Sequence, residues 1–73
     1  IRAGKTAGAV FNAANERAVA AFLEEKISFG QIAELVDDAL QGADLPEPDS
    51  LETILAADQN ARRRVQERVR RTD

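Results

Sequence analysis

Apolar residues recur along this chain at steps of three and four, the spacing of one face of an α-helix. Between residues 6 and 25 this stripe is uninterrupted by proline and contains Val10, Phe11, Ala14, Ala18, Ala21 and Phe22, with Val19 and Leu23 beside it. Both prolines, Pro46 and Pro48, fall within residues 42–49, which we expect to form a loop because proline disfavours helix in the residue before it. The pattern predicts an all-α protein.

The expected helices cover residues 6–25, 28–41, 50–57 and 59–71, and one continuous helix from 50 to 71 is the alternative for the last two. Thr6 is a candidate N-cap for the first helix. Ser28 with Gln31 three residues later has the spacing of a capping box, and Ile27 with Ile32 has that of a hydrophobic staple.

The other helix ends also carry sequence signals. Gly42 occupies the position of a C′ stop for the second helix. Asp49 or Ser50 is the expected cap of the third helix and Asp58 that of the fourth. The apolar faces of the last three helices should comprise Ile32, Leu35, Val36, Ala39 and Leu40; Leu51, Ile54 and Leu55; and Ala61, Val65 and Val69. Leu45 should pack back into the core from the loop. The chain as a whole should form a small bundle of three to four helices.

Length and composition limit the possible functions. The chain has 73 residues, which is one domain at most, and it contains no His and no Cys. Disulfides, zinc ligand sets and thiol or histidine catalysis are therefore excluded. The absence of Cys is compatible with a cytoplasmic protein. No apolar run approaches the roughly 20 residues that span a bilayer, and the net charge of −3 argues against non-specific nucleic-acid binding.

The first residues suggest that this chain is part of a longer one. It begins at Ile1 and contains no Met. Residues 1–4, Ile-Arg-Ala-Gly, resemble the last turn of a helix followed by a C′ glycine. We therefore expect a fragment that starts at the end of an earlier helix.

Asn12, Asn15 and Glu16 form the most unusual polar group, because helical spacing places them on one side of an otherwise apolar helix. They could contact a ligand or a cation, although one carboxylate and two amides make a poor cation site. The alternative is a structural polar cluster that fixes helix packing or docks another domain, since buried polar groups must be paired. We favour the structural alternative.

Two charged groups have simpler interpretations. Six arginines crowd the C-terminal helix, namely Arg62, Arg63, Arg64, Arg68, Arg70 and Arg71. They could bind phosphate, but no aromatic residue is interleaved for base stacking, and Glu67 has the spacing to pair with four of them on a solvated face. Glu34, Asp37 and Asp38 should likewise face water, as should Gln41.

The block Asn12-Ala13-Ala14-Asn15-Glu16 is the centre of a family resemblance. Together with the flanking residues 7–23, it strongly resembles the C-terminal helical domain of 1-deoxy-D-xylulose 5-phosphate reductoisomerase. The segment Ile27-Ser28-Phe29-Gly30-Gln31-Ile32 is similar to the same family. So are Pro48, the segment Ser50-Leu51-Glu52-Thr53-Ile54-Leu55, Asp58 and Ala61-Arg62.

The resemblance implies a parent enzyme with three parts: an NADPH-binding domain, a catalytic domain and a C-terminal helical bundle. This chain corresponds to part of that bundle. That enzyme is a homodimer that makes 2-C-methyl-D-erythritol 4-phosphate for non-mevalonate isoprenoid biosynthesis, using NADPH and Mg²⁺ or Mn²⁺. No catalytic, cofactor-binding or metal-binding residue carries over to this chain, which should be inactive by itself.

The expected partner is the catalytic domain of the same enzyme, contacted through Asn12, Asn15 and Glu16. A bundle that lacks one helix should also expose an apolar groove, so we expect the chain by itself to self-associate. Two other functions fit the residues alone. One is a stand-alone helical protein–protein interaction module, and the other is a small nucleic-acid-binding protein that uses the arginine-rich helix.

Overall fold

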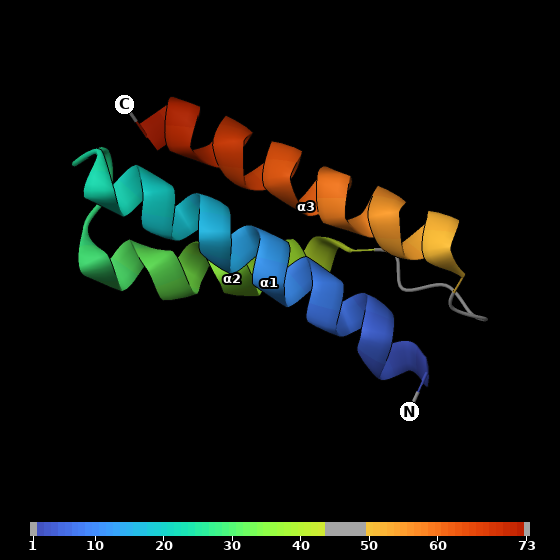
Figure 1. Cartoon of the computed structure of the whole chain (residues 1–73). Helices are drawn as coiled ribbons and strands as arrows, with labels where there is room; N and C mark the ends of the chain where they lie inside the picture. The colour runs from blue at the N-terminus through green and yellow to red at the C-terminus, as the bar shows by residue number, and fades with distance from the viewer. Residues whose placement is uncertain (1, 44–49, 73) are drawn as a thin grey trace.

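The structure is a computed structural model that describes residues 2–43 and 50–72. Within these residues it contains three helices, α1 (Arg2–Leu23), α2 (Phe29–Gly42) and α3 (Leu51–Thr72). In Figure 1, α1 and α3 run in the same direction and α2 runs antiparallel to both. Helix α1 packs on both of the others, and α2 and α3 contact each other least. The all-α small bundle predicted from the sequence is confirmed.

Helix α1 starts earlier than its sequence signals indicate. It is already helical at Arg2, so the predicted start at residue 6 is wrong, as is the interpretation of residues 2–4 as the end of a separate helix. Thr6 is fully buried inside the helix and does not cap it. Gly4 and Gly8 each cost about 1 kcal/mol relative to Ala, which the packing of the alanine-rich face can offset.

The C-terminal end of α1 is formed by a residue in the left-handed conformation. Glu25 has φ 64°, and its N–H donates to the Phe22 carbonyl at 2.9 Å. The Lys26 N–H donates to the Ala21 carbonyl, also at 2.9 Å. This is the hydrogen-bond pattern of a Schellman motif. It ends the helix at Leu23, two residues before the predicted end, and turns the chain towards α2.

Helix α2 begins as predicted and ends differently. Ser28 is extended, and its N–H donates to Gln31 Oε1 at 2.7 Å, which is the glutamine half of a capping box. Gly42 is still helical, so its assignment as a C′ residue is wrong. Ala43 follows in an extended conformation, with its N–H donating to the Leu40 carbonyl at 3.3 Å. Leu45 lies outside the described residues.

Helix α3 is continuous from Leu51 to Thr72, so the predicted break between 50–57 and 59–71 is wrong and the single-helix alternative is correct. Asp58 does not cap a new helix, because its carboxylate accepts from Arg62 Nε one turn later, at 2.6 Å. Ser50 caps α3: Oγ accepts from the Thr53 N–H at 3.1 Å, while the Ser50 N–H donates to Thr53 Oγ1 at 3.2 Å. Asp49 is not described.

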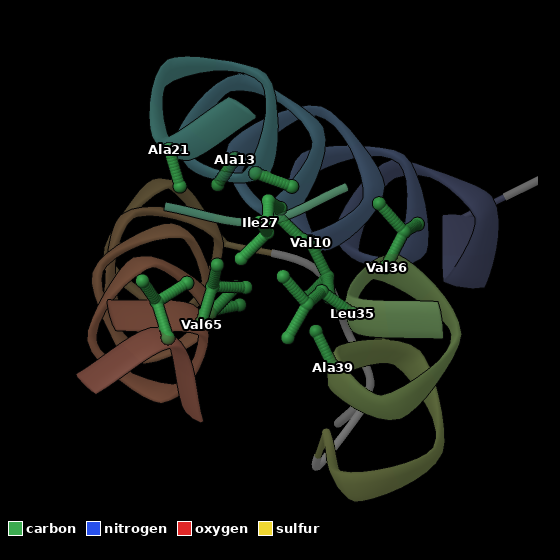
Figure 2. Packing of buried hydrophobic residues seen from close by; sticks show 13 residues of the cluster. Val10, Ala13, Ala21, Ile27, Leu35, Val36, Ala39 and Val65 are labelled. Carbon is green, nitrogen blue, oxygen red and sulfur yellow. The ribbon is translucent and has the colours of Figure 1, made fainter. Parts of the chain in front are cut away.

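The core lies between the three helices and consists mostly of alanine. Figure 2 shows its side chains converging on a common centre, with Val10 and Ala13 from α1, Leu35 and Ala39 from α2 and Val65 from α3. The full set of buried apolar residues is Val10, Ala13, Ala14, Ala18, Ala21, Ile27, Leu35, Val36, Ala39, Ala57, Ala61, Val65 and Val69.

Four residues predicted to lie on buried apolar faces are exposed instead. Phe11, Leu23, Leu51 and Leu55 are exposed, as is Phe29. The small alanine side chains let the helix backbones approach closely. The bulkier residues next to the alanine seam therefore stay exposed at its edges, where the neighbouring helices do not cover them.

Candidate interdomain surface

The predicted polar cluster lies on the outer side of α1. Asn12 and Glu16 are exposed and Asn15 is partly buried. Asn12 Nδ2 donates to Glu16 Oε2 at 3.3 Å. Within the described part of the chain, no hydrogen bond joins Asn15 to either residue. The structure thus brings Asn12 and Glu16 together and leaves the Asn15 amide beside them.

Glu16 also has a partner on α3, which the sequence analysis did not identify. Its Oε1 lies 3.1 Å from the Arg62 guanidinium, which in turn binds Asp58 through Nε. The hydrogen bond from Arg62 to Asp58, followed by that to Glu16, raises the pKa of Arg62 above its ordinary value. Beside this chain of charges, Arg17 donates to Gln66 Oε1 at 2.6 Å. Part of the polar face therefore joins α1 to α3.

A second ionic cluster joins α2 to α3. Asp38 accepts two hydrogen bonds from Arg64, at 2.8 Å from Nε and 3.3 Å from the terminal nitrogen, and Arg68 lies 3.5 Å away. The hydrogen bond from Arg64 is the main cause that lowers the pKa of Asp38, and Asp38 in turn raises the pKa of Arg64. The predicted water-facing position of Asp38 is wrong, because its side chain is only 23% exposed.

The sequence held a weak signal for this second cluster. Asp38 precedes the buried Ala39 and lies one turn after the exposed Glu34, so it falls at the edge of the apolar stripe of α2. Helical spacing pointed instead to Glu67 as the partner of the arginines. Only the placement of α3 against α2 shows that the fork-shaped guanidinium of Arg64 meets a carboxylate from another helix.

Large apolar side chains are exposed at both ends of the bundle. At the α1–α2 end, Leu23 is 73% and Phe29 75% exposed, and the Phe22 and Phe29 rings meet edge to face with centroids 5.7 Å apart. On α3, Leu51 and Leu55 are exposed near its start. Large apolar side chains that stay exposed near one another on a small protein can form an interaction site. These residues are therefore candidates for contact with another domain.

The described residues offer no metal centre. Across residues 2–43 and 50–72, no group of three or more Asp, Glu, His or Cys side chains is placed to hold a metal ion. In the same ranges, no helix combines the length and the apolar character needed to cross a membrane.

The comparison with known proteins identifies the family. A family model described as the DXP reductoisomerase C-terminal domain matches residues 1–64, a stretch that includes Asn12, Asn15 and Glu16. The chain belongs to this family. The resemblance noted from the Asn-Ala-Ala-Asn-Glu block is confirmed.

Curated relatives of this family carry the name 1-deoxy-D-xylulose 5-phosphate reductoisomerase. The chain is 58% identical over 69 residues to the protein of that name from Synechocystis and 53% identical over 66 residues to that from Ralstonia nicotianae. Each alignment covers 90% of this chain and 17% of the relative. The chain thus spans about a sixth of the length of these enzymes. No solved structure matches the chain.

Proposed function

We propose that this chain is the C-terminal helical domain of a 1-deoxy-D-xylulose 5-phosphate reductoisomerase and that it supports the catalytic part without contributing catalytic groups. The observation that carries this proposal is the family match over residues 1–64, together with relatives about half identical to this chain. Their names support a parent enzyme that rearranges and reduces this phosphosugar. The chain aligns with a small part of each relative, which leaves the rest of the length for the chemistry.

Cofactor and metal binding belong to the remainder of the parent in this proposal. NADPH would supply the hydride for the reduction, and Mg²⁺ or Mn²⁺ would bind oxygen ligands of the substrate site. The described residues do not fit the metal ion, since their carboxylates are dispersed and Asp38, Asp58 and Glu16 are already paired with arginines. The parent's homodimeric state and its cytoplasmic location remain predictions from the resemblance.

The supporting role requires a surface that meets the catalytic domain. Phe29 and Leu23 expose most of their side chains at one end of the bundle, and burying a Phe or Leu side chain contributes about 1.5–3 kcal/mol. Asn12 and Asn15 add amide donors and acceptors on the outer side of α1. We infer that these apolar and polar groups contact the catalytic domain and fix its position relative to the bundle.

The activity is tested with the complete polypeptide that carries this chain and, in parallel, with residues 1–73 alone. We expect the complete polypeptide to oxidise NADPH when it is given 1-deoxy-D-xylulose 5-phosphate and a divalent cation, and we expect the 73-residue chain to be inactive. A purified, folded complete polypeptide without this activity would reject the proposed function. If the native polypeptide instead has a mass near that of the chain, 7.9 kDa, the stand-alone interaction module becomes the better explanation.

The supporting role is tested by Phe29→Ser and Asn15→Ala in the complete polypeptide. Phe29→Ser removes exposed apolar surface, and Ala33→Ser, an exposed site on the same helix, is its control. If the surface is buried against the catalytic domain, Phe29→Ser and Asn15→Ala lower the melting temperature or kcat and Ala33→Ser does not. Wild-type values for both test variants would show that this surface is not an interdomain contact.

A further inference from the structure

An open groove separates α2 from α3 on the side away from α1. Its volume is about 530 Å³, and small residues form most of its wall, among them Ala39, Gly42, Ala57 and Ala61. These short side chains leave the two helices without an interlocking apolar seam, in agreement with the sparse contact between α2 and α3. Apart from the packing of both helices on α1, the distance between α2 and α3 therefore depends on polar contacts between them.

One side chain crosses from α3 to α2 at this groove. Arg64 lines the groove and donates two hydrogen bonds to the Asp38 carboxylate, in the fork-shaped geometry that gives an ion pair direction as well as charge. Arg68 approaches the same carboxylate from one turn further along α3. Isolated surface ion pairs contribute little to stability. They contribute more when an arginine makes two hydrogen bonds to the carboxylate and when a second cation lies nearby.

Gly42 lies directly under this guanidinium. A Cβ at position 42 would stand 2.5 Å from Arg64 Cζ and 2.7 and 2.8 Å from its terminal nitrogens. Gly42 has no positive φ and is helical, so its backbone does not require glycine. Gly8 and Gly30 are also helical, and a Cβ there would meet nothing within 4 Å. Gly42 is therefore distinguished from them by the close approach of Arg64.

We propose that Asp38, Arg64 and Gly42 form a latch that holds α3 at a fixed distance from α2, with Gly42 providing the space in which the guanidinium reaches the carboxylate. The latch takes the place of a packed seam between these two helices. Releasing it lets α3 move relative to α2 while the packing of both helices on α1 is retained. This inference concerns the packing of the chain itself and does not depend on the proposed function.

The first test compares glycine substitutions by hydrogen–deuterium exchange in the complete polypeptide. Gly30→Ala should slow local exchange or leave it unchanged, because Ala favours helix. Gly42→Ala displaces the guanidinium, so we expect amide exchange in residues 57–64 of α3 to become about two- to fivefold faster, the range given by well-oriented surface ion pairs. If α3 is as well protected from amide exchange in Gly42→Ala as it is in Gly30→Ala, the latch proposal is overturned.

The second test is a double-variant cycle. Asp38→Asn should accelerate exchange in α3, and the neighbouring Asp37→Asn, whose side chain accepts from Gln41 within α2, should not. In the Asp38→Asn background, Gly42→Ala should have no further effect, because Arg64 is no longer held above the glycine. Independent effects of the two substitutions would contradict the proposal. If Asp38→Asn does not fold, Arg64→Lys, which keeps the charge and loses the fork, serves in its place.

Discussion

At the scale of single residues, side-chain size decides which apolar positions are buried. Ala14 and Ala18 are completely inaccessible, whereas Phe11, on the same helix, is half exposed. Hydrophobicity alone ranks these residues in the opposite order. Close packing reverses the order because a helix seam of alanines has no space for a ring.

The alanine seam predicts that larger side chains are not tolerated there. Ala18→Leu adds three carbons at a position with 0% exposure and should lower the free energy of unfolding by about 1–3 kcal/mol. Ala33→Leu, at an exposed position of α2, is the control and should change it by about 0.5 kcal/mol or less. Urea unfolding measures both. Equal stability of the two variants would show that the seam is looser than the structure indicates.

The Asp38 carboxylate predicts a pH dependence with a definite sign. In the folded state, the pKa of this carboxyl lies below its ordinary value of 3.8, mainly because of the hydrogen bond from Arg64. The unfolded state therefore binds the proton more tightly, and the stabilisation is present above the unfolded pKa and is lost as the pH falls through the folded pKa.

Unfolding should therefore be measured from neutral pH down through the acid range. Asp38→Asn should be less stable than the wild type at neutral pH, and the difference should shrink as the pH falls below about 4. Asp37→Asn is the matched control and should keep most of the wild-type pH dependence in this range. A stability difference for Asp38→Asn that is constant with pH would mean that the carboxylate charge is not the stabilising feature.

At the scale of the helices, the ends were harder to predict than the helices themselves. The sequence predicts Ser28 as a cap, and Ser50 as one of two candidates with Asp49, because a cap side chain acts within three residues along the chain. The end of α1 was missed because Glu25, not glycine, takes the left-handed conformation. The break at Asp58 was predicted because Asp is a good cap, whereas its carboxylate is bound one turn ahead by Arg62.

The Schellman end of α1 gives a prediction for Glu25. Replacing it by glycine removes the steric cost of a left-handed L-residue, about 1–2 kcal/mol, and adds chain entropy to the unfolded state. The net result for Glu25→Gly should be a gain of up to about 1 kcal/mol in unfolding free energy. Glu24→Gly, one residue earlier, should be destabilising because its N–H still donates to the Ala20 carbonyl in helical fashion. Thermal unfolding of the two variants should move in opposite directions.

At the scale of the whole molecule, the described bundle is elongated, 37 by 17 by 17 Å, with apolar side chains exposed towards both ends. Its interior is thin for its length, since more than half of the buried apolar residues are alanine. Small domains of this kind are often marginal by themselves. The exposed Phe29, Leu23, Leu51 and Leu55 provide the surface through which such a bundle gains stability from a partner.

The isolated 73-residue chain should therefore self-associate. We expect its weight-average mass in light scattering to rise with concentration above the monomer value of 7.9 kDa. Phe29→Ser combined with Leu55→Ser should shift the association to higher concentration, whereas Ala33→Ser should not. A monomer that persists at millimolar concentration would contradict this expectation.

The sequence alone determined the helical class, the cap at Ser28, the apolar centre of α3 and the family resemblance, because each depends on residues close together along the chain. The tertiary structure decided the rest. Whether Phe11 or Ala14 is buried depends on which side of α1 faces α2 and α3, and whether Arg64 pairs with Glu67 or Asp38 depends on the distance between two helices. Helical periodicity is local, whereas the rotation and spacing of helices are set by contacts between distant segments.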